Sequence, residues 1–340
     1  MTNRRDWDNA FTGEGHRGLV EHAPSFAGAQ SFLRRRFTRD LEGVDVAVIG
    51  VPLDTATTNR PGARFGPRAL RAASSSLVWA RPWPWAIDPL EELAVIDYGD
   101  CPFDHGYPAD VPAEITAFIE PVVAAGVRTL VFGGDHFISY PVLKAHAKHH
   151  GPLSLVHFDA HSDTWADEKG RIDHGTMFWH AVQDGIVDDA HSAQIGLRTT
   201  NDDPLGFNIF DARFVHEYGT DEVVHRVRDV VGDRKVYLTF DIDCLDPAFA
   251  PGTGTPVCGG LSSHQALEIV RGLAGLHLVG ADVVEVAPAY DVGEITAFAG
   301  ATLATEFLCL FASDPSRSAR SSAGNRAEDV GQPVGTGGAA

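Results

Sequence analysis

The chain has 340 residues, enough for one large α/β domain or two small ones, and a formal charge of -19 from 46 acidic and 27 basic residues. This charge repels nucleic acid and anionic membranes and favours cationic partners. Four cysteines lie far apart without a CxxC pair, which argues against a thiolate zinc site or disulfide framework and favours a cytoplasmic protein. No signal peptide is evident, and no apolar run is expected to reach transmembrane length.

Composition divides the chain into three segments. Residues 1–40 are polar and weakly periodic, and are predicted to be an extension that either packs on the domain or a neighbour or stays solvated. Residues 41–313 form one predicted domain. Residues 314–340 change to Ser, Arg, Gly and Pro with little apolar content, which predicts a disordered tail.

Strand and helix patterns alternate through the domain. Apolar runs predict strands at residues 44–51, 93–98, 129–136, 153–158, 193–197, 213–216, 236–241 and 277–286. Helices are expected at residues 68–73, 112–125, 139–149, 178–183, 221–231, 262–273 and 294–311. This alternation is typical of an α/β protein with one mostly parallel, helix-covered sheet.

Metal-capable side chains stand at the ends of three of these strands. Asp159, His161 and Asp163 follow the run 155–158 at every second position, and side chains two apart on an extended backbone point the same way. Asp241 and Asp243 close the run 236–240, and His136 follows another strand. If the three strands are neighbours in a parallel sheet, these six side chains meet at its carboxyl edge.

The six side chains supply two imidazoles and four carboxylates. This oxygen-rich set without thiolates suits Mn²⁺ better than a structural Zn²⁺ site, while Zn, Co, Ni and Fe stay possible. Four carboxylates would nearly neutralise two divalent ions, and two ions about 3.5–4 Å apart can share one water. The set therefore predicts a two-metal centre, although any one carboxylate alone could be a solvated or helix-capping group.

Several runs resemble the signatures of the ureohydrolase family, and within it the agmatinases. The similarity covers about residues 45–311 and lies in Phe132–His136, His157–Asp163, Asp173–Phe178, Thr239–Pro256 and Asp282–Asp291. The resemblance implies a three-layer α/β/α sandwich of the arginase type with two Mn²⁺ ions per subunit. It also implies a homo-oligomer, a trimer or hexamer.

The resemblance further implies a role for each residue. Asp159 and Asp241 would bridge the ions, and the other four ligands would complete them: His136 and Asp163 for one, His161 and Asp243 for the other. Glu285, closing its own strand away from the six, would pair with the substrate guanidinium, or alternatively form a structural ion pair. His174 would deliver a proton to the leaving amine, or alternatively fix its loop.

Two nearby residues are expected to have supporting positions. His157 shares the strand face of Asp159 but lies deeper, which favours a core residue or one that orients a ligand. Cys244 has the opposite parity to Asp241 and Asp243, so it is predicted to be packed and not catalytic.

These features together favour hydrolysis of a guanidino compound to urea and an amine. The resemblance implies agmatine as the substrate and putrescine as the product, and the acidic chain is compatible with a cationic substrate. Guanidinobutyrate or a substituted guanidine or biguanide is an alternative substrate. A catalytically silent partner subunit is the alternative from another class, against which the intact ligand set, Glu285 and His174 argue.

Overall fold

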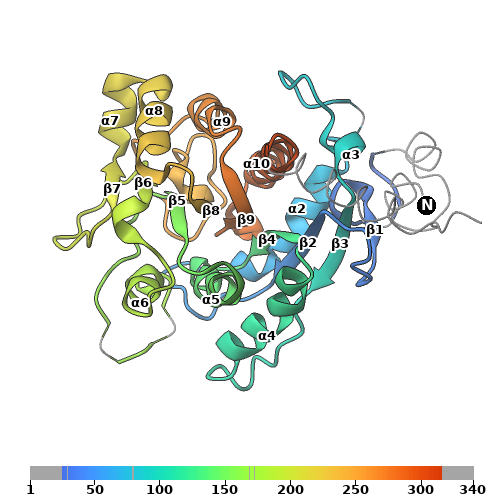
Figure 1. Ribbon diagram of the computed structural model, residues 1–340, viewed down its shortest axis with the longest axis horizontal. Coiled ribbons are helices and arrows are strands. Elements are labelled where there is room, and N and C mark those ends of the chain that lie inside the picture. Colours follow the sequence, from blue (N-terminus) through green and yellow to red (C-terminus); the bar gives the residue numbers. More distant parts are fainter. Residues whose placement is uncertain (1–24, 29, 79, 168, 172, 316–340) are drawn as a thin grey trace, which may run out of the picture.

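A single parallel sheet forms the centre of the computed structural model, which describes residues 25–28, 30–78, 80–167, 169–171 and 173–315 (Figure 1). Its nine strands follow the order β1-β3-β2-β4-β9-β8-β5-β6-β7, and every pairing is parallel. The strands are β1 (Arg36–Phe37), β2 (Val46–Val51), β3 (Val95–Asp100), β4 (Arg128–Gly133), β5 (Ser154–Phe158), β6 (Ala193–Ile195), β7 (Asn208–Phe210), β8 (Lys235–Asp241) and β9 (His277–Val284).

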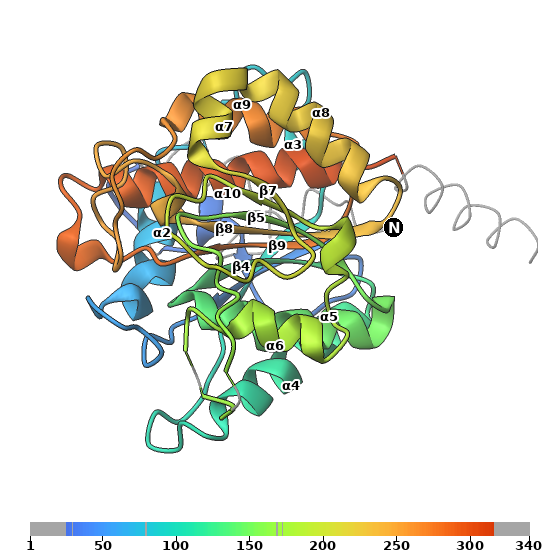
Figure 2. The ribbon, with the colours of Figure 1, turned by 90° about the vertical axis from the view of Figure 1, so that its left-hand side faces the viewer.

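Helices cover both faces of this sheet, so the α/β/α sandwich is confirmed (Figure 2). One face carries α4 (Val111–Ala124), α5 (Ser139–His150) and α6 (Met177–Gln183). The other carries α7 (Ala212–Tyr218), α8 (Thr220–Val231), α9 (Ser263–Gly272) and α10 (Ile295–Ala312), with α2 (Gly66–Ser74) packed on α10 and the short α3 (Pro89–Glu92) beside it.

The central strands are apolar because both of their faces are buried. In β4, Leu130 and Phe132 belong to the core under α8, α9 and α10, whereas Val131 belongs to the core under α4 and α5. Alternation along a strand sends successive side chains to opposite faces, so two apolar cores need a continuous apolar run. The same rule leaves the strand ends as the place where polar side chains can gather.

One predicted strand is wrong. Residues 213–216 lie within helix α7, and the edge strand is the preceding β7. The Asp211 carboxylate accepts a hydrogen bond from the Phe214 amide and caps the helix, while Ala212 and Val215, three apart, turn toward the core. The cap and this helical spacing decide the local structure over the β-prone residues between them.

Part of the predicted N-terminal extension belongs to the sheet. Strand β1 pairs with β3, and Phe32 is buried with its ring centroid 4.9 Å from that of Phe132. Residues 31–37 therefore pack on the domain, one of the two alternatives for this segment. Residues 1–24, which begin the predicted extension, lie outside the described part of the chain.

The C-terminal boundary also differs from the expectation. Asp314, the first residue of the predicted tail, is buried and forms an ion pair with Arg128 at the start of β4. Residues 316–340 lie outside the described residues, so the predicted disorder stays a prediction.

Helix α10 corrects the expectation that no apolar segment reaches transmembrane length. Its 18 residues are long and apolar enough to cross a membrane by length and composition, but 72% of them are buried inside the protein. The helix is apolar because it packs on α2, α9 and β9. This burial is characteristic of a core helix in a globular domain.

Candidate metal centre

Four neighbouring strands, β4, β9, β8 and β5, deliver the candidate residues to one edge of the sheet. His136 follows β4, Asp159 follows β5, Asp241 ends β8 and Glu285 follows β9. The expectation of three adjacent strands is thus incomplete, because β9 lies between β4 and β8. Glu285 consequently stands beside the six candidate ligands and not away from them.

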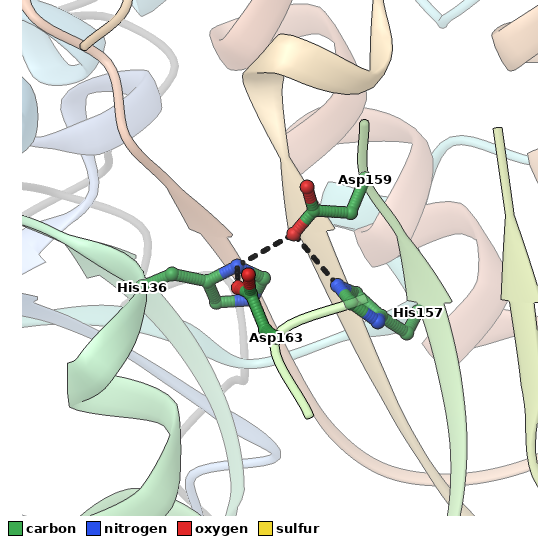
Figure 3. Close-up of side chains that lie close together, drawn as sticks. All are labelled: His136, His157, Asp159 and Asp163. Atoms are coloured by element: carbon green, nitrogen blue, oxygen red, sulfur yellow. Dashed lines mark hydrogen bonds and ion pairs between the residues drawn. The ribbon is translucent and has the colours of Figure 1, made fainter. Parts of the chain in front are cut away.

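The first cluster gathers around the imidazole of His136. Its Nδ1 atom lies 3.0 Å from Asp159 Oδ2, 3.1 Å from Asp163 Oδ2 and 3.3 Å from Asp241 Oδ2. Figure 3 shows Asp159 and Asp163, both from the segment that follows β5, converging on this nitrogen. His136, Asp159, Asp163 and Asp241 can therefore surround one ion.

The second cluster shares Asp159 with the first. His161 Nδ1 lies 3.2 Å from Asp159 Oδ1 and 3.2 Å from Asp243 Oδ2. The two oxygens of Asp159 thus face different histidines. Two overlapping groups of ligand atoms that share one carboxylate are the arrangement expected of a binuclear centre.

Hydrogen bonding fixes which nitrogen of His136 faces the carboxylates. The Thr239 hydroxyl donates to Asp282 Oδ1 at 2.6 Å, and its oxygen lies 2.8 Å from His136 Nε2. Because the hydroxyl has only one proton, Nε2–H must donate to Thr239, which leaves the lone pair of neutral His136 on Nδ1. Burial lowers the pKa of His136, but Asp159, Asp163 and Asp241 outweigh it and raise the pKa, because Nδ1 faces their three oxygens. Nδ1 therefore binds a cation, either a proton or a metal ion in the same position.

The electrostatics of the carboxylates lead to the same requirement. Burial raises the pKa of Asp163 to about 7, with the nearby charge of Asp159 adding to the effect. Burial and the charges of Asp243 and Asp159 raise the pKa of Asp241 well above its usual value. These carboxylates can all be ionised together only with added positive charge, and a hard divalent ion provides it.

His157 supports Asp159 instead of binding an ion. Its Nδ1 accepts a hydrogen bond from Gln194 Nε2 at 3.1 Å, so Nε2–H donates to Asp159 Oδ2 at 2.8 Å. Burial lowers the pKa of His157 to about 4, although Asp159 opposes this shift, so the ring is neutral. His157 is close enough to join the first cluster, but its unprotonated nitrogen, Nδ1, already accepts the hydrogen bond from Gln194. It therefore orients the shared carboxylate.

His174 and Glu285 form a pair beside the clusters. His174 Nδ1 lies 2.7 Å from Glu285 Oε1, which also accepts the amide of His136 at 3.0 Å. Burial lowers the pKa of His174, but the hydrogen bond and charge of Glu285 outweigh it and raise the pKa to about 9. On its other side, Nε2 accepts the amide of Thr58 at 3.0 Å and lies 2.8 Å from the Thr58 hydroxyl. The Thr58 amide favours an unprotonated Nε2, whereas Glu285 favours the charged ring, so His174 has one partner for each protonation state and can take up and release a proton.

The second oxygen of Glu285 has no hydrogen-bond partner although it is buried. A Cβ at Gly254 would lie 3.4 Å from this Oε2 atom, so the glycine keeps space beside it. A buried carboxylate oxygen without a donor is costly, and a cationic ligand would satisfy it. Glu285 is also held at φ +61, a conformation that nonglycine residues rarely adopt and that clusters at functional sites.

A cavity of about 160 Å³ opens onto the centre. This is smaller than the roughly 300–1,000 Å³ of pockets for drug-sized ligands and suits a small molecule. Its lining comprises Thr58, His161, Asp163, Trp165, Asp173, His174, Gly175, Asp241 and Thr255. Candidate ligands, the candidate proton donor and the mouth of the site thus share one space.

The parallel sheet and the buried double His/Asp cluster define an α/β/α protein whose strand-end side chains fit metal binding. A family model described as the Arginase family matches residues 44–310, and the chain belongs to this family. An agmatinase from Chromobacterium violaceum is 54% identical over 288 residues, covering 84% of this chain and 89% of its own.

Solved structures agree with the assignment. A structure described as a hypothetical agmatinase from Burkholderia thailandensis has a TM-score of 0.85 and 58% identity, covering 87% of this chain and 94% of its own. Proclavaminate amidino hydrolase from Streptomyces clavuligerus has a TM-score of 0.78 and 38% identity, with coverages of 85% and 99%. The family therefore includes relatives with different named substrates on one fold.

Sequence reasoning missed the residues that lie behind the candidate ligands. Thr239 stands two positions before Asp241 on the same strand face and pairs in register with Asp282 on β9. The signal was available, because Asp282 is a lone carboxylate inside an apolar strand. Thr58 gave no such signal, since its loop reaches His174 only through the fold.

Proposed function

We propose that this chain is an agmatinase-like amidinohydrolase, which converts agmatine and water to putrescine and urea. The observation that carries the proposal is the double His/Asp cluster sharing Asp159, of whose candidate ligands His161, Asp163 and Asp241 line one cavity with His174. Glu285, bonded to His174, has an unpartnered oxygen behind this lining. An electrophile held by Glu285 would lie beside both clusters and a proton donor.

Two divalent ions fit the ligand set, and we assign them as Mn²⁺ because oxygen ligands predominate, with Ni, Co or Zn as alternatives. His136 and Asp163 would complete one ion and His161 and Asp243 the other, with Asp159 and Asp241 shared. When bound, such a pair lowers the pKa of a shared water and so supplies hydroxide near neutral pH. The residues already face each other at 3.0–3.3 Å, so little rearrangement is needed.

The remaining residues position the substrate and move protons. Glu285 Oε2 would accept a hydrogen bond from the guanidinium, a charge-assisted contact that fixes its carbon against the attacking oxygen. The water oxygen joins that carbon and loses both of its protons as it becomes the carbonyl oxygen of urea. The bond from carbon to the substituted nitrogen breaks with its electron pair going to nitrogen, and this nitrogen gains the two protons, one of them through His174. Urea and a protonated amine are then the products.

Release of urea by the purified protein tests the proposal. The protein is reconstituted with Mn²⁺ and given agmatine, guanidinobutyrate and arginine, and equal molar amounts of urea and amine are expected from the preferred guanidine. His174→Gln should retain both ions but lower kcat, because the leaving nitrogen loses its proton donor. No urea from any guanidine, with both ions bound, would favour the silent partner subunit instead.

We further propose a cytoplasmic homo-oligomer, a trimer or hexamer. All four cysteines are free thiols, which suits a reducing compartment. A groove of about 300 Å³ between α9 and α10 is lined largely by apolar side chains, and Phe249, Ile295 and Phe298 at its rim are exposed. Such a patch supports association. Light scattering of the full chain gives the number of subunits.

A further inference from the structure

Asp173 and Trp165 line the cavity but belong to neither cluster. Among the described carboxylates that line it, Asp173 alone lies outside the six candidate ligands. The Asp173 side chain is 19% exposed, so it stands at the boundary between the enclosed site and solvent. Its function is not explained by holding a metal ion.

The hydrogen bonds of Asp173 leave one oxygen able to accept another cation. Oδ1 accepts the amide of Gly175 at 2.9 Å and so closes a tight turn. Oδ2 lies 3.7 Å from the guanidinium of Arg171, whose side chain is 59% exposed. An exposed pair at this distance is weak and screened by salt, so Arg171 does not satisfy the carboxylate.

Trp165 provides an aromatic surface in the same part of the cavity. Its amide donates to the carbonyl of Gly175 at 3.1 Å, and a Cβ at Gly175 would lie 3.0 Å from the indole ring. The absent side chain thus lets the indole lie against the backbone next to Asp173. A cation between an indole face and a carboxylate gains from both.

The charges of the whole site indicate what this cation is. Four carboxylates in the ligand set balance two divalent ions, and Glu285 has one oxygen on His174 and one without a partner. Asp173 remains as a further negative group whose cationic neighbour is the exposed Arg171. We propose, resting on the guanidine hydrolysis above, that Asp173 and Trp165 bind the second positive charge of a linear dication, an ammonium group at the end remote from its guanidinium. Glu285 receives the guanidinium end.

This subsite selects against the alternative substrates. A guanidine that ends in a carboxylate, such as guanidinobutyrate, would place like charge against Asp173. A guanidine that ends in a methyl group would keep the contact with Trp165 but gain nothing from the carboxylate. The structure therefore predicts the order agmatine, butylguanidine, guanidinobutyrate for kcat/KM.

The test compares these three substrates in Asp173→Asn and a matched control. Asparagine keeps the oxygen that accepts from Gly175, so the turn is retained. Asp104→Asn removes a charge from the same kind of turn, where Oδ1 of Asp104 accepts the amide of Gly106 at 2.8 Å outside the cavity. All proteins are compared at saturating Mn²⁺, with their metal content measured.

Asp173→Asn should lower kcat/KM for agmatine about 10–100-fold, mainly through KM, because a charge-assisted contact is lost. In Asp173→Asn, kcat/KM for butylguanidine should change by less than about two-fold and kcat/KM for guanidinobutyrate should rise. Asp104→Asn should have the kcat/KM values of the parent. Trp165→Leu should lower kcat/KM for agmatine more than kcat/KM for butylguanidine.

Equal losses on agmatine and butylguanidine would overturn the subsite, because they would show a general effect on the loop. Unchanged kinetics on agmatine would overturn it as well. If the parent protein releases urea from butylguanidine and guanidinobutyrate but not from agmatine, the subsite fails while guanidine hydrolysis stands. Urea from none of the three would overturn the proposed function together with the subsite.

Discussion

Replacing Thr239 by Val should weaken metal binding although Thr239 touches no proposed ion. Its hydroxyl joins His136 Nε2 at 2.8 Å to Asp282 Oδ1 at 2.6 Å. Valine has nearly the same shape, so the cavity left behind is negligible. What is lost is the group that holds the His136 lone pair on the nitrogen facing the carboxylates.

The magnitude follows from the groups left without partners. His136 Nε2–H and Asp282 Oδ1 are both buried, and each unsatisfied group costs about 1–3 kcal/mol. Asp282 Oδ2 keeps its bonds from Ser139 and Tyr237, so the carboxylate stays in place. The affinity of the ion bound by His136 should fall about 10–100-fold, as is usual when a group behind a ligand is removed.

Calorimetric titration of the metal-free protein with Mn²⁺ measures this loss, and thermal unfolding measures stability separately. Thr239→Ser keeps the hydroxyl and should bind nearly as the parent. Thr129→Val is the matched control, because Thr129 on β4 makes a similar contact outside both clusters: its Oγ1 lies 2.8 Å from Nε2 of His146 on α5. It should lower stability without changing metal affinity. Equal metal affinity in Thr239→Val and the parent would refute the reasoning.

Three further predictions concern separate parts of the chain. Glu285→Gln should keep both ions but lower kcat/KM roughly 30- to several-thousand-fold, since an unpaired buried cation costs about 2–5 kcal/mol; activity equal to the parent would place the guanidinium elsewhere. A chain ending at Pro315 should unfold at the parent Tm. A chain ending at Ala312 loses the buried ion pair of Asp314 with Arg128 and should unfold several degrees lower, so equal Tm values for these two chains would contradict the prediction. Burial lowers the pKa of His146 to about 3, so His146 takes up a proton in the unfolded chain, below pH about 6.5, before it does so in the folded chain. This difference should remove roughly 2 kcal/mol of stability by pH 5, and denaturant titrations should show a smaller loss in His146→Gln. Equal losses in the variant and the parent would count against this prediction.

The convergence of the candidate ligands could be predicted because it depends on local rules. Two-residue spacing after an apolar strand places Asp159 and His161 together, and parallel strands share their carboxyl edge. The exact positions could not be predicted in this way. Asp163 lies on a loop at φ +53, and a nonglycine residue in that conformation is held there by tertiary packing, not by sequence spacing.

The neighbours of each strand depend on long crossovers that periodicity does not encode. The chain passes from β4 to β5 across the space that β8 and β9 later fill, so Glu285 comes to lie next to His136. In α7, by contrast, the information was local. The Asp211 cap marks a helix start that the β-prone residues after it conceal.

Anomalous diffraction from crystals of the full chain reconstituted with Mn²⁺ tests the central claim most directly. Two peaks per chain are expected, about 3.5–4 Å apart, with Asp159 shared between them. One peak should lie against His136 and Asp163, and the other against His161 and Asp243. A single ion in a fully active protein, or two ions that do not share Asp159, would contradict it.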